Sequence, residues 1–249
     1  DGGQPARGRA SSDAPVRGVS PDARPYRICP LRRADRPAVR RICAACAWMG
    51  AAAPARIGDA WIWAEFWTRF FTDRQRELSW AVADVPSAHV VGYLTGTDDV
   101  RRFDRYVPFL LPGVLARVIR KRRMHRASSR RALLALGRSF LHGELALPAG
   151  VAARYPATFH VNLLPQARRR GIGRAMLERF LARLERLRVP GAHAQLLGDN
   201  KAIQSLCCRA GFRQIASGRL TAFAHLDGVA TEIGTWVRAM NDKPGGAVL

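Results

Sequence analysis

The stretch "ATFHVNLLPQARRRGIGRAMLERFLARLERL", residues 157–187, decides the fold because a strand, a glycine turn and a helix follow one another directly. Residues 157–165 predict a strand bounded by prolines. Apolar residues then recur at the spacing of one helix face, which predicts a helix that stops at Pro190: Ile172, Met176, Phe180, Leu184 and Leu187. Between the two, "QARRRGIGRA" sets three arginines beside a Gly-x-Gly, which indicates an anion site.

The physical basis of that site is the backbone. Gly171 and Gly173 allow close approach of a ligand, and the first amides of the following helix are unpaired and carry the positive end of its dipole. A nucleotide P-loop needs Lys and Ser or Thr after its last glycine, but Arg174 and Ala175 stand there. A dinucleotide turn needs a small residue where Met176 stands. A basic helix start without any ligand is the alternative.

The rest of the chain predicts an α/β domain over residues 25–240. Residues 1–24, rich in Gly, Pro, Ser and Arg, predict a disordered basic arm, and 241–249 a flexible tail. A helical insertion, residues 100–156, separates the third and fourth strands. The other expected elements are a strand in 26–31, helices in 33–50 and 59–75, a hairpin in 78–99, a strand in 192–198, a helix in 200–210, and strands in 212–217 and 228–240. This order predicts a mixed sheet with helices on both faces.

The composition is strongly basic, with a formal net charge of +22. Such a field attracts nucleic acid or phosphate-rich ligands, but only three of the 41 basic residues are lysines, which indicates a general arginine bias. The five cysteines have no disulfide spacing, and Cys43 and Cys46 lack the further ligands of a zinc site. No apolar stretch has a spanning or secretory pattern. We therefore expect free thiols, no metal, no membrane and a cytoplasmic protein.

Two units together resemble a known family. The first is the glycine motif, residues 168–173, and the second runs from Asn200 and Ala202 to Gly211 and Phe212. They resemble motif A, Q/R-x-x-G-x-G/A, and the second motif of the GNAT superfamily of acyl-CoA-dependent N-acetyltransferases. The resemblance covers residues 26–240. Residues 155–174 and the hairpin "GYLTGTDD" are further similar to bacterial acetyltransferases that resemble the C-terminal domain of O-GlcNAcase.

The resemblance implies acetyl-CoA as co-substrate and a central sheet that splays open to receive it. The pantetheine would pair with the backbone of Val161, Asn162 and Leu163, and Asn200 belongs to the second motif. The pyrophosphate would bind in the glycine loop, at Arg168, Arg169, Arg170, Gly171, Ile172, Gly173 and Arg174.

Catalytic candidates follow from the same comparison and from strand parity. The tyrosine acid of the family falls at Cys207, and a small helix residue is the alternative reading of that cysteine. Strand alternation puts Thr158, His160 and Asn162 on one face. We expect His160 to act as base, with Asn162 beside it, against the alternative of a hydrogen-bonded core histidine. The carboxylates that flank the insertion are further acceptor-binding candidates: Asp98, Asp99 and Glu144.

Three functions are consistent with these features. The first is an acetyl-CoA-dependent N-acetyltransferase that acts without a metal on a small-molecule or peptide amine by direct attack in a ternary complex. The second is a CoA-binding module that has lost catalysis, which the cysteine at 207 favours. The third, less favoured, is a nucleic-acid-associated protein that uses the basic arm and "RKRR" at 120–123, although that segment also fits a solvated helix face. The sequence does not determine the acceptor or the oligomeric state.

Overall fold

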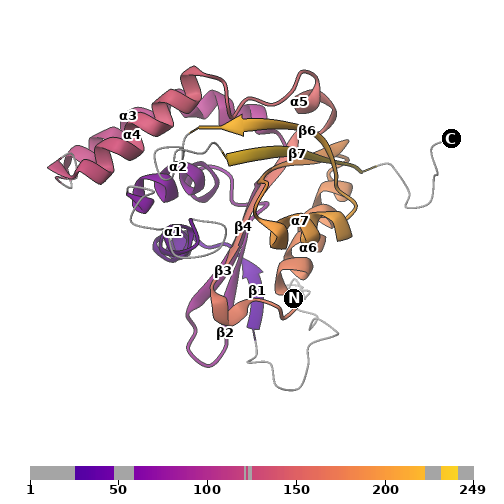
Figure 1. The fold of residues 1–249 in the computed structure, drawn as a ribbon. Helices are drawn as coiled ribbons and strands as arrows, with labels where there is room; N and C mark the ends of the chain where they lie inside the picture. The colour runs from indigo at the N-terminus through magenta and orange to yellow at the C-terminus, as the bar shows by residue number, and fades with distance from the viewer. Residues whose placement is uncertain (1–25, 48–58, 121, 123–124, 222–230, 241–249) are drawn as a thin grey trace, which may run out of the picture.

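The computed structural model describes residues 26–47, 59–120, 122, 125–221 and 231–240 (Figure 1). The predicted arm, residues 1–24, and the tail, 241–249, lie outside this range. The elements are β1 (Tyr26–Pro30), α1 (Arg36–Ala45), α2 (Ala60–Asp73), β2 (Trp80–Asp84), β3 (Val90–Thr97), α3 (Val100–Arg120), α4 (Ala127–Leu141), α5 (Val151–Arg154), β4 (Ala157–Leu163), α6 (Ile172–Arg186), β5 (Gly191–Leu197), α7 (Lys201–Arg209), β6 (Arg213–Leu220) and β7 (Thr231–Ala239). Their order and type confirm the α/β prediction.

The strands form one mixed sheet in the order β1-β2-β3-β4-β5-β7-β6. Every neighbouring pair is antiparallel except β4 and β5, which pair in parallel only at Ala157 with Ala192 and at Thr158 with His193. Beyond these residues β4 continues against β3, and β5 continues against β7. The sheet therefore splays between its two central strands, as the resemblance implied.

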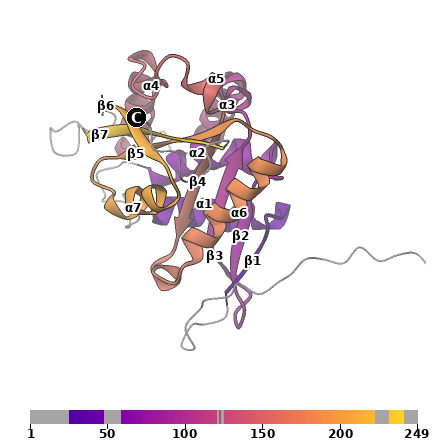
Figure 2. The same ribbon diagram turned by 90° about the vertical axis from the view of Figure 1, so that its right-hand side faces the viewer.

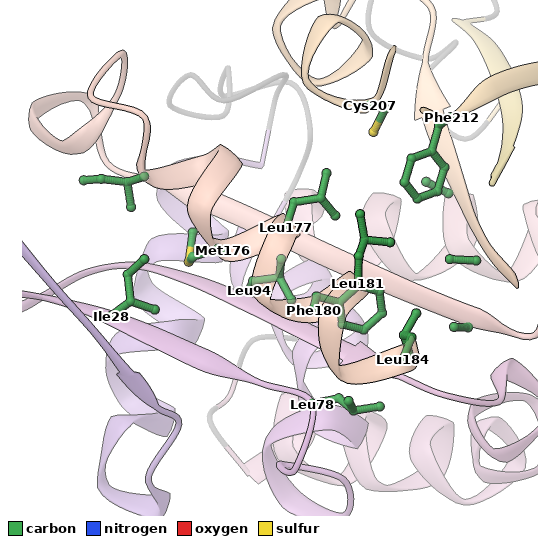
Figure 3. Packing of buried hydrophobic residues seen from close by; sticks show 14 of the residues in the cluster. Ile28, Leu78, Leu94, Met176, Leu177, Phe180, Leu181, Leu184, Cys207 and Phe212 are labelled. Atoms are coloured by element: carbon green, nitrogen blue, oxygen red, sulfur yellow. The ribbon is translucent and has the colours of Figure 1, made fainter. Parts of the chain in front are cut away.

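Helices cover both faces of the sheet. Helices α1 and α2 lie on one face and α6 on the other (Figures 1 and 2). The alternation of β3 divides its side chains accordingly, since Tyr93 packs in the cluster of α1 while Leu94 packs in the cluster of α6. Figure 3 shows the buried residues of α6 in that second cluster. At Gly96 a Cβ would lie only 2.4 Å from Cε2 of Phe180, so the missing side chain lets α6 approach the sheet closely.

The described residues of the insertion, 100–156, are mainly helical. Helix α3 begins at Val100 and continues through Pro108 and Pro112 to Arg120. The basic segment 120–123 was expected within a helix. Instead α3 ends at Arg120, and Arg122 has a left-handed φ of 51°. Helix α1 also ends at Ala45, before the predicted end at residue 50, and residues 48–50 lie outside the described ranges.

Candidate functional site

The glycine loop joins β4 to α6 through a sharp turn. After a single 3-10 turn, Pro165–Ala167, the chain reverses at Arg169, with φ 56°, and Gly171, with φ 75°. Gly171 is the N-cap of α6, and its carbonyl accepts the first helical hydrogen bond, from the amide of Ala175 at 3.0 Å. A left-handed N-cap favours glycine because a side chain there is strained. The turn is therefore fixed by the sequence at Gly171.

The backbone amides of this loop are unpaired. Within the described part of the chain, no protein acceptor forms a hydrogen bond with the amides of residues 169–174. A Cβ placed on Gly171 would meet no atom within 4 Å, and one on Gly173 would make ordinary contact with Leu163 and Leu206. Successive unpaired amides at a helix N-terminus form an anion site. The loop thus offers its backbone to an anion beside the end of β4.

The arginine side chains of the loop are largely engaged with the protein itself. Arg168 donates from Nε to the carbonyl of Leu163 at 2.7 Å and from Nη2 to Sγ of Cys46 at 3.5 Å. The guanidinium of Arg174 pairs with Glu178 at 2.7 Å. That of Arg170 donates to the Gln166 carbonyl and lies over the ring of Tyr26. The side chains of Arg168, Arg170 and Arg174 are therefore paired within the protein, whereas the loop amides are not.

The phase of the β3–β4 ladder decides which backbone groups of β4 face the splay. The amide of Leu164 donates to the carbonyl of Val91 at 2.8 Å. In an antiparallel pair the bonding direction alternates, so Asn162 and His160 direct their backbone groups toward β3. The alternate residues Val161 and Leu163 direct theirs toward the gap. This register weighs against the expectation that the backbone of Asn162 faces a ligand in the gap, because β3 pairs with it; for Val161 and Leu163 the expectation stays a prediction.

On the α1 side of β4, three side chains meet at one hydroxyl. The Tyr93 hydroxyl lies 3.2 Å from Nδ1 of His160 and accepts from Nδ2 of Asn162 at 3.0 Å. Cys43 of α1 packs in the same buried cluster as Tyr93 and interacts electrostatically with it. The predicted polar face of β4 is thus present. The Tyr93 hydroxyl contacts both His160 and Asn162 on this face, and the sequence analysis did not single out Tyr93. Its apolar neighbours in the sequence gave no signal of this role.

Burial controls the ionisation of this group. Desolvation lowers the pKa of His160 to about 4, so the imidazole is neutral at physiological pH. Burial, reinforced by the neighbouring Cys43, holds the pKa of Tyr93 well above its usual value. Desolvation also raises the pKa of Cys43 to about 12. The three groups therefore form a neutral network.

The second sequence unit has a structural role in the described residues. Asn200 is the N-cap of α7, and its side chain accepts from the amide of Ile203. Cys207 is fully buried in the cluster between α6 and α7, beside Phe212 (Figure 3). Desolvation raises the pKa of its thiol to about 12. This environment favours the alternative of a small helix residue, and the role of Cys207 as the acid stays a prediction.

The flanking carboxylates also stabilise local structure. Asp98 accepts from Gln75 and pairs with Arg102, and the side chain of Asp99 accepts from the amide of Arg101 at the start of α3. Glu144 accepts from Ser139 and from Thr221, which ties the end of α4 to the end of β6. These contacts favour ordinary capping and bridging roles over acceptor binding.

The described residues offer neither a metal site nor a membrane-spanning helix. No group of three or more His, Cys, Asp or Glu within them could hold a metal ion. No helix among them is both long and apolar enough to cross a bilayer.

Comparison with known proteins agrees with this architecture. No family model matches the chain. A solved structure named SsHAT matches with a TM-score of 0.66 and 27% identity, over 87% of this chain and 99% of that one. YncA from Salmonella typhimurium, a putative acetyltransferase solved with its cofactor acetyl-CoA, matches with a TM-score of 0.51 and 13% identity, over 90% of this chain and 99% of its own.

A third structure carries the family name. It is a GNAT-superfamily phosphinothricin acetyltransferase from Sinorhizobium meliloti in complex with acetyl-CoA, with a TM-score of 0.51, 16% identity, and coverage of 89% of this chain and 92% of its own. The splayed sheet and the glycine turn at the start of α6 were expected from the family resemblance, and the similar folds of these solved structures agree with that expectation. This chain therefore has the fold of solved acetyltransferases, among them a member of the GNAT superfamily.

Proposed function

We propose that this chain is an acyltransferase that uses acetyl-CoA to acetylate an amine. The observation that carries the proposal is the set of unpaired amides at residues 169–174 beside a β4 edge that has parted from β5. Acetyl-CoA supplies an activated acetyl thioester. The solved structures of similar fold that contain acetyl-CoA support the choice of this co-substrate.

The chain has two regions that fit such a co-substrate. The amides of residues 169–174 would hold its pyrophosphate, and the backbone of Val161 would pair with the pantetheine arm in the splay. The carbonyl of Leu163 already accepts from Arg168, so this contact limits how far the pairing extends along the strand. Gly171 keeps the turn open where a side chain would strain it.

The Tyr93 network would orient the base. A hydroxyl has one proton and two lone pairs. One lone pair of the Tyr93 hydroxyl accepts from Asn162, and the other would accept from Nδ1–H of His160. This arrangement assigns the free lone pair of the imidazole to Nε2. His160 would then take the proton from the amine at Nε2, directly or through water.

The low pKa of His160 limits the strength of this base. An imidazole with a pKa of about 4 is neutral at pH 7 but removes protons poorly from a strongly basic ammonium group. The site therefore suits amines that are already largely neutral at working pH. We expect kcat/KM to rise with pH toward the pKa of the acceptor amine and to show no inflection near 6.5.

Release of CoA thiol in the presence of a panel of amines of graded pKa tests the proposal. Calorimetric binding of acetyl-CoA together with thiol release by at least one amine supports it. Absence of acetyl-CoA binding overturns it. Tyr93→Phe removes the hydroxyl that orients His160, and it should lower kcat more than it changes the dissociation constant of acetyl-CoA.

A CoA-binding protein without catalysis is the second candidate, because the buried Cys207 replaces the tyrosine of the family motif. It predicts acetyl-CoA binding with no thiol release from any amine of the panel. The narrower similarity to O-GlcNAcase-like acetyltransferases and the identity of the acceptor stay predictions.

A further inference from the structure

A pocket of about 500 Å³ lies on the outer side of helices α1 and α2, away from the sheet. This volume falls within the usual range for small-molecule sites. Helix α1, helix α2 and the end of the inserted helix α3 each contribute charged or aromatic residues to its wall: Arg40, Arg41, Trp61, Glu65, Arg117 and Arg120.

Helix α1 separates this pocket from the proposed acetyl-transfer site. Its residues Val39, Ile42 and Cys43 pack toward the sheet, in the cluster that contains Tyr93. Arg40 and Arg41 leave the helix on the other side and line the pocket. The pocket is therefore distinct from the glycine loop and from the polar face of β4.

The floor of the pocket is a carboxylate shared by two arginines. Glu65 is only 2% exposed, and Nη1 of Arg117 donates to both of its oxygens, at 3.1 and 2.9 Å. Nε of Arg40 lies 3.1 Å from the same carboxylate. The only other acid at this cluster within the described residues is Asp73, and it already pairs with Arg36, Arg40 and Arg69.

Positive charge exceeds negative charge in the pocket wall. Four guanidinium groups face one carboxylate there. Among the described residues, neither Arg41 nor Arg120 has a hydrogen bond or ion pair, and Nε and Nη2 of Arg117 have no acceptor. Burial lowers the pKa of Arg40, Glu65 and Asp73 oppose this shift, and the like charges of Arg117 and Arg69 add to it. An oxyanion would relieve this repulsion and accept from the remaining planar donors.

We propose that this arginine pocket is a second ligand site, which binds an organic oxyanion of at least two negative charges, with the apolar part of the ligand against Trp61. Two or more charges match the excess of arginine over Glu65 in the wall. Phosphate and carboxylate groups share the geometry that a guanidinium recognises in bidentate fashion. Trp61 is partly exposed at the wall and offers an aromatic surface beside these donors.

The test is calorimetric titration of the full chain with sodium pyrophosphate and, separately, with citrate. No CoA is added, because its phosphates would also fit this pocket; an anion that binds at the glycine loop instead would keep its affinity in the double variant described next. Arg41→Gln combined with Arg120→Gln removes two wall charges that have no partner among the described residues. Arg186→Gln, on the exposed side of α6, removes a like charge remote from the pocket and serves as the matched control.

We expect saturable binding of at least one anion to the wild type, weakened about tenfold in the double variant and unchanged in Arg186→Gln. If pyrophosphate binds more tightly than citrate, the pocket recognises phosphate groups; if citrate binds more tightly, it recognises carboxylates. Absence of saturable binding by both anions, or equal affinity in the double variant, overturns the proposal. The variants report on this pocket whether or not the chain binds CoA, so failure here is distinct from failure of the proposed acetyl transfer.

Discussion

Acidification should destabilise the fold through His160. The imidazole has a pKa of about 4 in the folded protein because desolvation disfavours its charged form. In the unfolded chain the pKa of a histidine is about 6.5. As the pH falls below 6.5, the unfolded chain takes up a proton that the folded protein refuses, so the free energy of unfolding decreases until the pH reaches the folded pKa.

The expected size follows from the two pKa values. Between pH 7 and pH 4.5 this one residue should lower the free energy of unfolding by about 2.5 kcal/mol. His160→Gln removes the titration while it retains a side chain that can hydrogen-bond. The pH-dependent loss in the wild type should therefore exceed that in the variant by about 2.5 kcal/mol, because other groups contribute equally to both.

Urea unfolding followed by circular dichroism at both pH values measures this difference. Long-range ¹H–¹⁵N spectra of the imidazole report the pKa of His160 directly in the folded protein. A titration of His160 near pH 6.5, or equal acid losses in wild type and variant, would refute the conclusion that desolvation keeps the imidazole neutral.

Three further changes test other parts of the structure. Gly171→Val forces a branched residue to φ 75° and should weaken CoA binding by at least about a hundredfold in calorimetry. Arg169→Ala should weaken CoA binding only about threefold. The reverse ranking would contradict an anion held by the backbone. Glu65→Ala should lower the free energy of unfolding by about 3–5 kcal/mol because two guanidinium groups lose their shared carboxylate, and a loss below about 1 kcal/mol in urea unfolding contradicts that view. Cys207→Ala should leave the rate of thiol release within about twofold, since the thiol is buried in the core, and a loss of about a hundredfold would restore it as the acid.

Local sequence patterns determined the elements of this protein. Helical spacing from Ile172 to Leu184 and the glycine at 171 fixed a helix and its left-handed N-cap, because these choices depend on neighbours within a few residues. The alternation of Thr158, His160 and Asn162 likewise predicted the polar face of β4. The sequence did not show that α3 continues through Pro108 and Pro112, because this depends on its packing against α2.

Long-range contacts determined what these elements do. Tyr93 meets His160 across 67 residues of sequence, and Arg168 reaches back to Cys46 across 122. The phase of the β3–β4 ladder, which turned the backbone of Asn162 away from the gap, depends on which residues pair across strands. Glu65 lies between arginines from α1 and α3, and no sequence motif indicates that contact.

The sequence by itself determined the strand, the glycine turn and the helix, since short-range backbone preferences set them. Only the tertiary structure decided which side chains meet around His160 and around Glu65, because packing and burial bring them together from distant parts of the chain.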